Sequence, residues 1–524
     1  MSFEQLALPL TGLLPQPEPA RIPRTRRVFV NRNLKMASID WVGFDMDYTL
    51  AIYNQVEMDR LSVRATLDKL VLRSYPADVL REVDYKIDFP IRGLLIDKRY
   101  GHILKMDRFK VVQKGYHGLR ELSKDEIRAL YQSKKIRPTT ARYHWIDTLY
   151  ALSEATIYTG VVQAFEQRGL ELDFARLFTD IRECIDEAHR DGTILDEVNL
   201  DLPRFVERDP MLAQTLHKLR SAGKKLFLLT NSRWQYTEKM MTYLLGGAMP
   251  EYPSFRHYFD VIIVAAQKPA FFQETRPLMR REGPGNEGTR PATVPLERGA
   301  IYEGGNLHDF ETMIGVTGDR VLYVGDHIYG DILRSKKESA WRTAMIIQEM
   351  EAEVVAHEAC REMHKKSSEL EQRREELEDQ LRYYQQRYKE LTRKIDDDPA
   401  RHGANGALVD GNGAPVMRAV ANGPISNGPG LGPEVDRARV KRAVERIRGQ
   451  LRQVDSEAST LEREIAQRFH PYWGSLLKEA NETSSFGDQV EEYACVYTSR
   501  VSNLLSYSPL QYFRSPRDLL PHEL

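Results

Sequence analysis

IDWVGFDMDYTL, residues 39–50, is the stretch that decides the fold. Its first half is apolar, and its second half begins abruptly with two carboxylates, Asp45 and Asp47. A buried parallel strand reads as a continuous apolar run, and open α/β sheets carry their chemistry just beyond the carboxyl ends of such strands. The stretch therefore predicts a central strand of a parallel sheet with two aspartates at its functional edge.

Three further stretches change from apolar to polar in the same way. KKLFLL leads into Thr-Asn-Ser at 230–232, FDVIIVAA into Gln-Lys-Pro at 267–269, and DRVLYV into GDHIYGD at 325–331. Between about residues 39 and 347, short β-rich runs alternate with helical periodicity, which is the pattern of an α/β domain. We therefore expect four polar clusters to meet in one crevice.

The composition excludes several classes of protein. Lys+Arg 75 against Asp+Glu 76 gives a formal charge of -1, which argues against binding to nucleic acid or to a membrane surface through a broad basic field. Three cysteines without a CxxC arrangement support neither a disulfide framework nor a structural zinc site. The longest apolar runs are strand-sized, and the first residues lack the layout of a signal peptide. We expect a cytoplasmic protein with no nucleic-acid or membrane partner.

A chain of 524 residues exceeds what one hydrophobic core organises. The gap between the first two polar clusters predicts an inserted cap, and helical periodicity at 119–133, 144–168 and 174–190 predicts that this cap is largely helical. The Gly- and Pro-rich residues 281–295 are expected to be an irregular surface excursion. The expected parts are an N-terminal arm at 1–35, a catalytic core at 36–54 and 215–349, a cap or substrate domain at 55–214, a hairpin at 350–469, and a C-terminal segment at 470–524 that docks on the core.

The expected hairpin has a composition of its own. Apolar residues recur at heptad spacing amid charged ones in two series, namely Leu370, Leu377, Leu381, Tyr384, Tyr388, Leu391 and Ile395, and then Val440, Val444, Ile447, Leu451, Val454, Ala458, Leu461 and Ile465. Such spacing is typical of coiled coils. The Gly-, Pro- and Asn-rich stretch at about 396–435 cannot form a packed core. These features predict an antiparallel coiled coil with a disordered tip.

The polar clusters contain what hydrolysis of a phosphate monoester requires. One carboxylate, Asp45, could attack phosphorus and form an aspartyl-phosphate. The second, Asp47, could protonate the leaving alkoxide and then take a proton from water. Because two carboxylates repel a phosphate, a Mg²⁺ ion is expected, with Asp326 as a further ligand.

The remaining clusters could bind the phosphoryl oxygens. Thr230 and Lys268 can donate a hydroxyl and an ammonium, and Asp331 could hold the lysine in position. Taken singly, each cluster has an ordinary explanation as a helix cap, a turn or a loop lysine. The prediction of an enzyme depends on their conjunction, in the chain order Asp-x-Asp, Ser/Thr, Lys and an acidic pair.

In this order the clusters resemble the four motifs of the haloacid-dehalogenase (HAD) superfamily. The segments GFDMDYTLAIY, TNS followed by YTEKMMTYLL, QKPAFF, YVGDHIYGDILRSKKESAWRT and the ending RSPRDLLPHE are similar to the cytosolic purine 5′-nucleotidases, a family that prefers inosine and guanosine monophosphates. The resemblance covers about residues 30–350 and 470–524. It implies a doubly wound parallel sheet of the HAD type, a Rossmann-like core, with a cap inserted between the first and second motifs.

The resemblance also implies roles for individual residues. The implied catalytic residues are Asp45, Asp47, Thr230 and Lys268, and the implied metal ligands are Asp45, Asp47 through its carbonyl, and Asp326. The implied substrate-binding residues are Tyr150, Arg182, Asp186, His189, Thr230, Asn231 and Lys268, with Ser232 and Asp331 in support. The Arg–Asp–His set, at steps of four and three residues, occupies one helical face, and an aromatic with an Arg/Asp pair suits a purine.

Two features qualify the resemblance. Leu195 stands where the family has a lysine on the phosphate side, which bears on base preference and affinity. The family's adenine-nucleotide effector site, at a subunit interface, is matched by Arg137 and Lys337, while Asp147 replaces an asparagine. Since the family forms tetramers, we expect a homo-oligomer, either a dimer or a tetramer.

Three hypotheses follow. The first is a Mg²⁺-dependent 5′-nucleotidase for 6-oxopurine monophosphates, with transfer of the phosphoryl group to another nucleoside as an additional expected activity. The second keeps the phosphatase chemistry but assigns another small phosphate ester, such as a sugar phosphate. The third makes the coiled-coil hairpin the main feature, as an interaction scaffold on a phosphatase body. The presence of all expected catalytic residues favours the first two.

Overall fold

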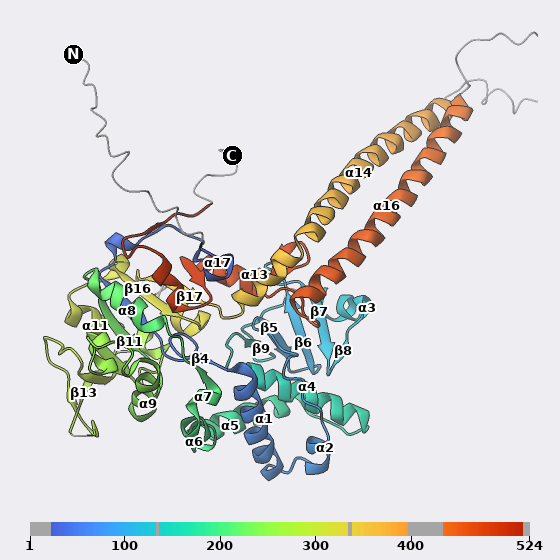
Figure 1. Cartoon of the computed structure of the whole chain (residues 1–524). Helices are drawn as coiled ribbons and strands as arrows, with labels where there is room; N and C mark the ends of the chain where they lie inside the picture. Colours follow the sequence, from blue (N-terminus) through green and yellow to red (C-terminus); the bar gives the residue numbers. More distant parts are fainter. Residues whose placement is uncertain (1–21, 133–135, 284, 334–337, 397–432, 517–524) are drawn as a thin grey trace, which may run out of the picture. The chain divides into compact units, whose positions relative to one another are not determined.

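The computed structural model describes residues 22–132, 136–283, 285–333, 338–396 and 433–516. The chain separates into two compact units, Met1–Ala356 with Phe469–Leu524, and His357–Arg468 (Figure 1). Most of the predicted disordered tip at 396–435 and the first part of the predicted arm lie outside the described residues.

A ten-stranded sheet forms the centre of the larger unit. Seven strands run parallel, and an antiparallel strand or hairpin extends each edge. The strand order is β1 (Phe29–Val30), β20 (Val496–Thr498), β17 (Arg342–Ile346), β16 (Val321–Gly325), β3 (Trp41–Phe44), β11 (Lys225–Leu229), β12 (Val261–Val264), β15 (Ile301–Gly304), β13 (Leu278–Glu282) and β14 (Gly288–Pro291). The strands that precede the four polar clusters, β3, β11, β12 and β16, therefore lie side by side.

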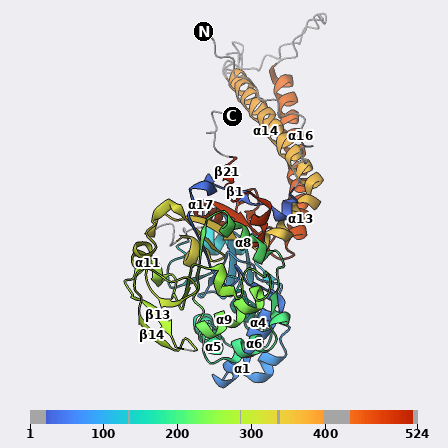
Figure 2. The same ribbon diagram turned by 60° about the vertical axis from the view of Figure 1, so that its left-hand side comes forward.

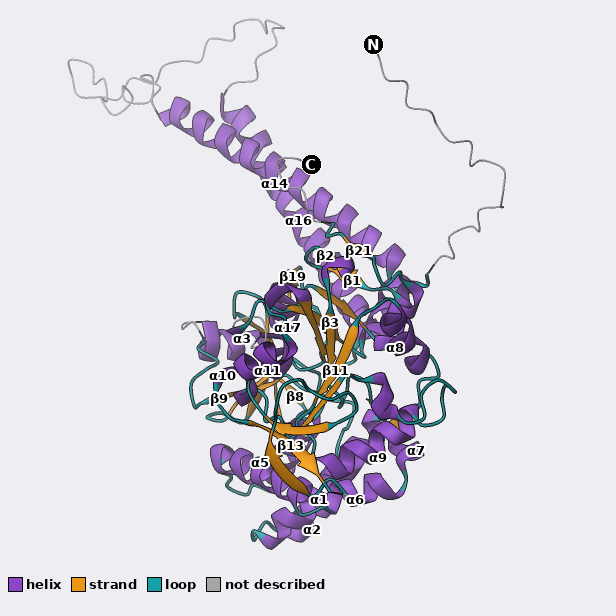
Figure 3. Cartoon of the chain, turned by 90° about the vertical axis from the view of Figure 1, so that its left-hand side faces the viewer, coloured by secondary structure: helices purple, strands orange, loops and turns teal. Residues whose placement is uncertain are grey.

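Alternate side chains of these strands enter two separate cores. Val42 and Phe44 of β3 face a core shared with α8 (Leu212–Ser221) and α9 (Trp234–Leu245). Trp41 faces a second core shared with α11 (Leu307–Ile314), and Figure 3 shows these helices on opposite sides of the sheet. Since both faces are covered, the strands are apolar throughout. The predicted HAD-like α/β fold class is confirmed.

A glycine in β3 permits the tight contact at the centre of the sheet. A Cβ atom on Gly43 would lie 2.0 Å from the ring of Phe227 on the neighbouring strand β11. Any larger residue would push the two strands apart, because the Phe227 ring is itself fully buried. The glycine therefore fixes the spacing of the strands that end at Asp45 and Thr230.

The cap contains helices and also a sheet that the sequence analysis did not predict. Its helices are α1 (Gln55–Leu72), α2 (Ala77–Arg81), α3 (Lys124–Ile127), α4 (Leu152–Gln167), α5 (Phe174–Arg190), α6 (Thr193–Leu200) and α7 (Leu202–Phe205). Its antiparallel sheet has the order β8 (Arg120–Glu121), β7 (Val112–His117), β6 (His102–Met106), β5 (Leu94–Asp97) and β9 (Tyr143–Ile146). Strands β5 and β6 are buried on both faces, so they lack the alternating pattern by which a strand is usually found.

The expected irregular excursion at 281–295 is in part a β-hairpin, and that prediction was wrong. Strand β13 pairs with β15 on one side and with β14 on the other. Gly283 takes a positive φ of 90° in the connecting turn. The hairpin extends the edge of the main sheet, where a strand needs a partner on one side only, so a glycine-rich, exposed stretch can still pair.

The C-terminal segment is part of the same unit as the catalytic core. Strand β20 pairs in parallel with β17, and β21 (Tyr512–Phe513) pairs with β2 (Leu34–Lys35). Helix α17 (Ser485–Tyr493) precedes β20 and packs Phe486 and Val490 into a core with Met345 of β17. Residues near both ends of the described chain thus complete one edge of the main sheet.

The second unit is a helical hairpin. It follows α13 (Met350–Ala359) and consists of α14 (Arg361–Asp396) and α16 (Pro433–Phe469), which run side by side in Figures 1 and 2. Figure 1 shows the chain running out along α14 and returning along α16, so the helices are antiparallel, and Arg374 Nε lies 3.4 Å from Asp455 Oδ1 between them. Within the described part of the chain, no helix combines the length and the apolar character needed to cross a membrane.

Candidate active site

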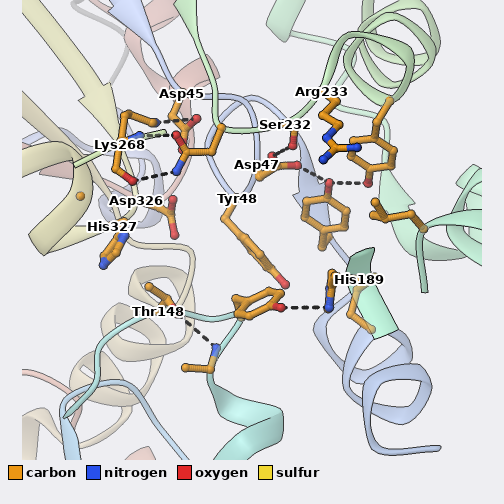
Figure 4. Close-up of a pocket in the computed structure, with 18 of the residues that line it drawn as sticks. Asp45, Asp47, Tyr48, Thr148, His189, Ser232, Arg233, Lys268, Asp326 and His327 are labelled. Atoms are coloured by element: carbon orange, nitrogen blue, oxygen red, sulfur yellow. Dashed lines mark hydrogen bonds and ion pairs between the residues drawn. The ribbon is translucent and has the colours of Figure 1, made fainter. Parts of the chain in front are cut away.

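A cavity of about 740 Å³ opens where the strand ends of the core meet the cap. The core contributes the residues that follow β3, β11, β12 and β16, and the cap contributes residues from α5, α6 and the segment before α4. Figure 4 shows Asp45, Asp47, Lys268 and Asp326 at one end of this cavity and His189 toward the other. The four polar clusters predicted from the sequence therefore do converge.

Lys268 lies at the centre of the core end. Its Nζ donates to Asp331 Oδ1 at 2.6 Å, and it lies 2.8 Å from Asp45 Oδ1 and 2.9 Å from the Tyr323 hydroxyl. Asp45 Oδ1 also accepts the backbone N–H of Met46 at 2.8 Å. One ammonium group thus joins the ends of three strands.

Burial and mutual repulsion dominate the electrostatics of this cluster. Burial raises the pKa of Asp45 well above its usual range, Lys268 opposes the rise, and Asp331 adds to it. The pKa of Asp326 is raised to about 7, first by burial and then by Asp331. Burial acts to lower the pKa of Lys268, but Asp331 and Asp45 outweigh it and the pKa is raised well above its usual value. The site is therefore short of positive charge.

The acidic cluster fits a hard divalent cation. One carboxylate oxygen from each of Asp45, Asp326 and Asp331 lies within 4.8 Å of the others. Buried carboxylates are the ligands that such cations prefer, and a cation would offset the repulsion that contributes to the raised pKa values of Asp45 and Asp326. Asp331 thus belongs to the acidic cluster in addition to holding Lys268.

Asp47 is held by two hydroxyl groups. Ser232 donates to its Oδ2 at 2.6 Å and Tyr53 donates to its Oδ1 at 2.5 Å. The Tyr53 hydroxyl also lies 2.8 Å from that of Tyr236, and all these residues line the cavity. Burial raises the pKa of Asp47, and the two hydroxyl donors oppose that rise. The carboxyl group is therefore fixed in orientation.

The three residues of the Thr-Asn-Ser cluster make different contacts. Thr230 is fully buried, its hydroxyl accepts the N–H of Ser232 at 3.1 Å, and it is not among the described residues that line the cavity. Asn231 exchanges two hydrogen bonds with the backbone of Lys268, at 2.6 and 3.0 Å. In this structure, Thr230 therefore shapes the turn, while Asn231 fixes the lysine and Ser232 reaches the cavity.

The cap end of the cavity combines aromatic, cationic and acidic groups. The Tyr150 hydroxyl lies 2.9 Å from His189 Nδ1, and the two rings are 4.7 Å apart. Arg182 Nε lies 3.7 Å from Oε1 of Glu154, and 43% of the arginine side chain is exposed. Burial raises the pKa of Glu154 to about 7, with Arg182 opposing the rise.

The other predicted residues are less closely associated with the cavity. Leu195 lines the cavity, but Asp186 is exposed and is not among the described lining residues, so the predicted Arg–Asp pair does not point into it. Arg137 is exposed and lies outside the described lining of the cavity. Lys337 lies outside the described residues.

Sequence reasoning missed several lining residues. Tyr53 and Tyr236 gave no local signal, because aromatics are common in cores. Glu154 did give one: it is the only acid in the stretch ALSEATIYTGVV, and an acid buried among apolar residues is often functional. His144, whose Nε2 lies 3.6 Å from Glu154 Oε2, was likewise overlooked.

The sheet and the site define a class of protein, the HAD-like hydrolases. The core has two aspartates after one central strand, a lysine two strands away and an acidic pair on the other side. The family model of the 5′ nucleotidase family matches residues 28–524, and the chain belongs to this family. It is accordingly a phosphoric monoester hydrolase, and the predicted family resemblance is confirmed.

Two relatives illustrate the family. The chain is 28% identical over 505 residues to a 5′-nucleotidase domain-containing protein of Dictyostelium discoideum, covering 95% of this chain and 74% of the relative. It is 32% identical over 357 residues to 5′-nucleotidase domain-containing protein 2 of Homo sapiens, covering 66% and 67%. A crystal structure of a predicted phosphoglycolate phosphatase from Haemophilus somnus overlaps 59% of this chain and 86% of its own, at 14% identity and a TM-score of 0.26.

Proposed function

We propose that the chain is a Mg²⁺-dependent 5′-nucleotidase that hydrolyses 6-oxopurine nucleoside 5′-monophosphates, such as inosine and guanosine monophosphate. The observation that carries the proposal is a single cavity with two unlike ends. The phosphate-type cluster of Asp45, Lys268 and Asp326 lies at one end, and Tyr150 and Arg182 lie at the other. A nucleotide also has two unlike ends, an anionic phosphate and a flat base.

The chemical step begins with Asp45. Its carboxylate attacks phosphorus, an aspartyl-phosphate forms, and the bond from phosphorus to the 5′ oxygen breaks. Asp47 gives its proton to the leaving oxygen, and the nucleoside departs. Asp47 then takes a proton from water, which attacks phosphorus and releases phosphate with Asp45 restored. A nucleoside hydroxyl in place of water would give phosphotransfer.

One group of the core would hold the phosphoryl oxygens, and a second would position the general acid. Lys268 offers a buried ammonium that Asp331 holds, and Asn231 fixes the backbone of this lysine. A preformed donor of this kind stabilises charge that develops in the transition state. Ser232 is fixed against Asp47 and keeps the acid directed into the cavity.

A Mg²⁺ ion would be held by Asp45, Asp326 and the carbonyl of Asp47. When bound, it would neutralise the phosphate and the surrounding carboxylates. Asp331, the third member of the acidic cluster, is more than an orienting group for Lys268 and would contribute negative charge next to the ion.

The cap would hold the base. The Tyr150 ring offers a flat face, and Arg182 offers hydrogen-bond donors for a carbonyl such as the 6-oxo group of a purine. His189 Nδ1 lies 2.9 Å from both the Tyr150 hydroxyl and the Ile185 carbonyl, and these contacts orient the ring. Leu195, an apolar residue, would contact the nucleotide where the family has a lysine.

Phosphate release from a panel of esters tests the proposal. Inosine and guanosine monophosphates should be hydrolysed faster than glucose 6-phosphate or an aryl phosphate, and EDTA should stop all of these reactions. Faster hydrolysis of the sugar phosphate would replace the base-binding assignment with the second hypothesis. Full activity in EDTA would remove the metal.

The family resemblance supports two further parts of the proposal. We propose an adenine-nucleotide effector and a homo-oligomeric enzyme in the cytoplasm. Arg137 is exposed, as an effector residue at a subunit interface would be in a single chain. Adding ATP to the phosphate-release assay tests the effector directly.

A further inference from the structure

The helical hairpin does not bury its own apolar seam. Of the fifteen residues in the two heptad series, five are nearly fully buried: Leu377, Leu391, Ile395, Ile447 and Leu461. The other ten, Leu381 and Leu451 among them, are only half-buried. Two helices leave both flanks of their seam open, whereas four helices enclose it. The seam therefore has apolar surface available for further helices.

Charged residues beside the seam change sign along the hairpin. Lys441, Arg448, Asp455 and Glu462 follow one another on α16 at seven-residue steps, each directly after a seam residue. They therefore form one row along an edge of the seam. The two cations lie in the half nearer residues 396 and 433, and the two acids lie in the half nearer residues 357 and 468.

Helix α14 continues the acidic part of this edge. Glu371 and Glu378 also come directly after seam residues, in the half that contains Asp455 and Glu462. Arg374, one of the cations of that region, lies 3.2 Å from Glu378 and 3.4 Å from Asp455. Within the described chain, Glu371, Glu462, Lys441 and Arg448 make no ion pair of 4.0 Å or less.

The two halves of the hairpin also differ in their total numbers of basic and acidic residues. The distal half, residues 380–396 with 433–452, contains twelve Lys and Arg but five Asp and Glu. The proximal half, residues 361–379 with 453–468, contains seven Lys and Arg but eleven Asp and Glu. The balanced charge of the whole chain conceals a hairpin that is basic at one end and acidic at the other.

We propose that the hairpin binds the hairpin of a second copy of this chain, in the opposite direction, to form a four-helix bundle. Two antiparallel copies bring the cations Lys441 and Arg448 of each against the acids of the other, and they enclose the half-buried seam. Two parallel copies would oppose like charges, which selects against that arrangement. A polyanionic partner such as RNA would match the distal half but would leave the acidic half and the seam unexplained.

Charge exchange tests the proposal in the full chain. One variant carries Lys441→Glu with Arg448→Glu, and the other carries Asp455→Lys with Glu462→Lys. Sedimentation equilibrium should show self-association weakened ~10-fold in each variant alone, since each change acts twice in a two-fold assembly. An equal mixture of the two should associate within ~3-fold of the unaltered chain, because opposite charges then face each other.

Further measurements separate the proposal from its alternatives. Arg60→Glu with Arg64→Glu reverses two exposed cations of α1 and should leave association unchanged. Should the charge reversals unfold the hairpin, Lys441→Gln with Arg448→Gln removes charge without repulsion and should still weaken association ~3-fold. The proposal is overturned if these distal variants self-associate as strongly as the unaltered chain. It is also overturned if the equal mixture of the two charge-exchange variants associates no more strongly than either variant alone. A distal variant that loses poly(U) RNA binding yet self-associates normally would instead favour RNA.

Discussion

The two walls of the cavity hold their buried acids in different ways. In the core, Asp45 and Asp331 lie 2.8 and 2.6 Å from one lysine ammonium. On the cap side, Glu154 is 3.7 Å from a half-exposed arginine. Asp59 of α1 is buried next to the lining residue Met58 and accepts a hydrogen bond from the neutral amide of Gln55 at 3.0 Å. The two core acids therefore lie close to a cation, while Glu154 and Asp59 of the cap are held more loosely than Asp97, which pairs with Arg142 at 2.6 Å elsewhere in the cap.

The difference matches the division of labour in a nucleotidase. Chemistry at phosphorus requires charges in fixed positions, and close ion pairs supply that rigidity. Recognition of a base requires only complementary shape and hydrogen bonds, and it varies with the substrate. We therefore expect changes in the core to affect all substrates, and changes in the cap to affect nucleotides selectively.

The largest effect is expected from Asp45→Asn. An amide is a poor nucleophile, so turnover of every phosphate ester should fall ~10⁴-fold or more. Phosphate release from inosine monophosphate and from an aryl phosphate measures this. Asp40→Asn, on the same segment but paired with Arg320 at the surface, serves as the control and should retain activity. Turnover by the Asp45 variant at a tenth of the normal rate would assign the attack to another group.

Lys268→Met should have the next largest effect. It removes the cation that faces Asp45 and Asp331, so kcat should fall ~10²–10³-fold for nucleotide and aryl phosphate alike. Lys224→Met is a matched control: this lysine is also buried in the core, where it donates to the carbonyls of Met36 and Ile39. The control should lose stability but keep kcat. Equal kcat losses in the two variants would mean that general destabilisation, and not the site, explains the result.

Asp59→Asn examines the buried cap acid whose partner is the neutral amide of Gln55. Burial raises the pKa of Asp59 from 3.8 to about 7. Because the folded protein holds this proton more tightly than the unfolded chain, the stabilising contribution is present below about pH 4 and is lost as the pH rises through about 7. Denaturant unfolding should find the variant more stable than the unaltered chain by ~2–4 kcal/mol near pH 8 but similar near pH 4.

Its control is Asp68→Asn, an exposed position on the same helix. The stability difference made by this change should be the same at both pH values. If Asp59→Asn also behaved identically at pH 4 and pH 8, the cap would not be storing a protonated acid, and the contrast between the walls would weaken.

The core could be predicted from the sequence because its signals are local. Each buried parallel strand is an apolar run, and each run ends in a polar cluster such as Asp45-Met46-Asp47. Parallel strands direct these ends to one edge, so four separate signals define one site. Thr230 is an exception among the predicted site residues. Its hydroxyl accepts the N–H of Ser232 in the turn after β11, and it is not among the described residues that line the cavity.

The cap could be predicted only in part because its contacts join distant residues. Strands β5 and β6 of the cap sheet are buried on both faces, so no alternation of apolar and polar residues indicated them in the sequence. The hydroxyl of Tyr53 meets that of Tyr236, 183 residues further along the chain, and β4 (Ile52–Tyr53) pairs with β10 (Val206–Glu207) across the cap insertion. Helical spacing put Arg182 and Asp186 on one face, but spacing alone does not say which of them the cavity meets.

The cap wall is probed most directly by Arg182→Ala. Removal of this guanidinium should raise KM for inosine monophosphate ~10–30-fold, because one charge-assisted hydrogen bond to the base is lost. The aryl phosphate should be unaffected, since it has no base to bind. Arg176→Ala, on the same helix α5 but 75% exposed and paired with Asp180, should change neither. Equal losses for both substrates would show that Arg182 acts on the shared phosphate chemistry, and the two walls would then no longer differ in what they recognise.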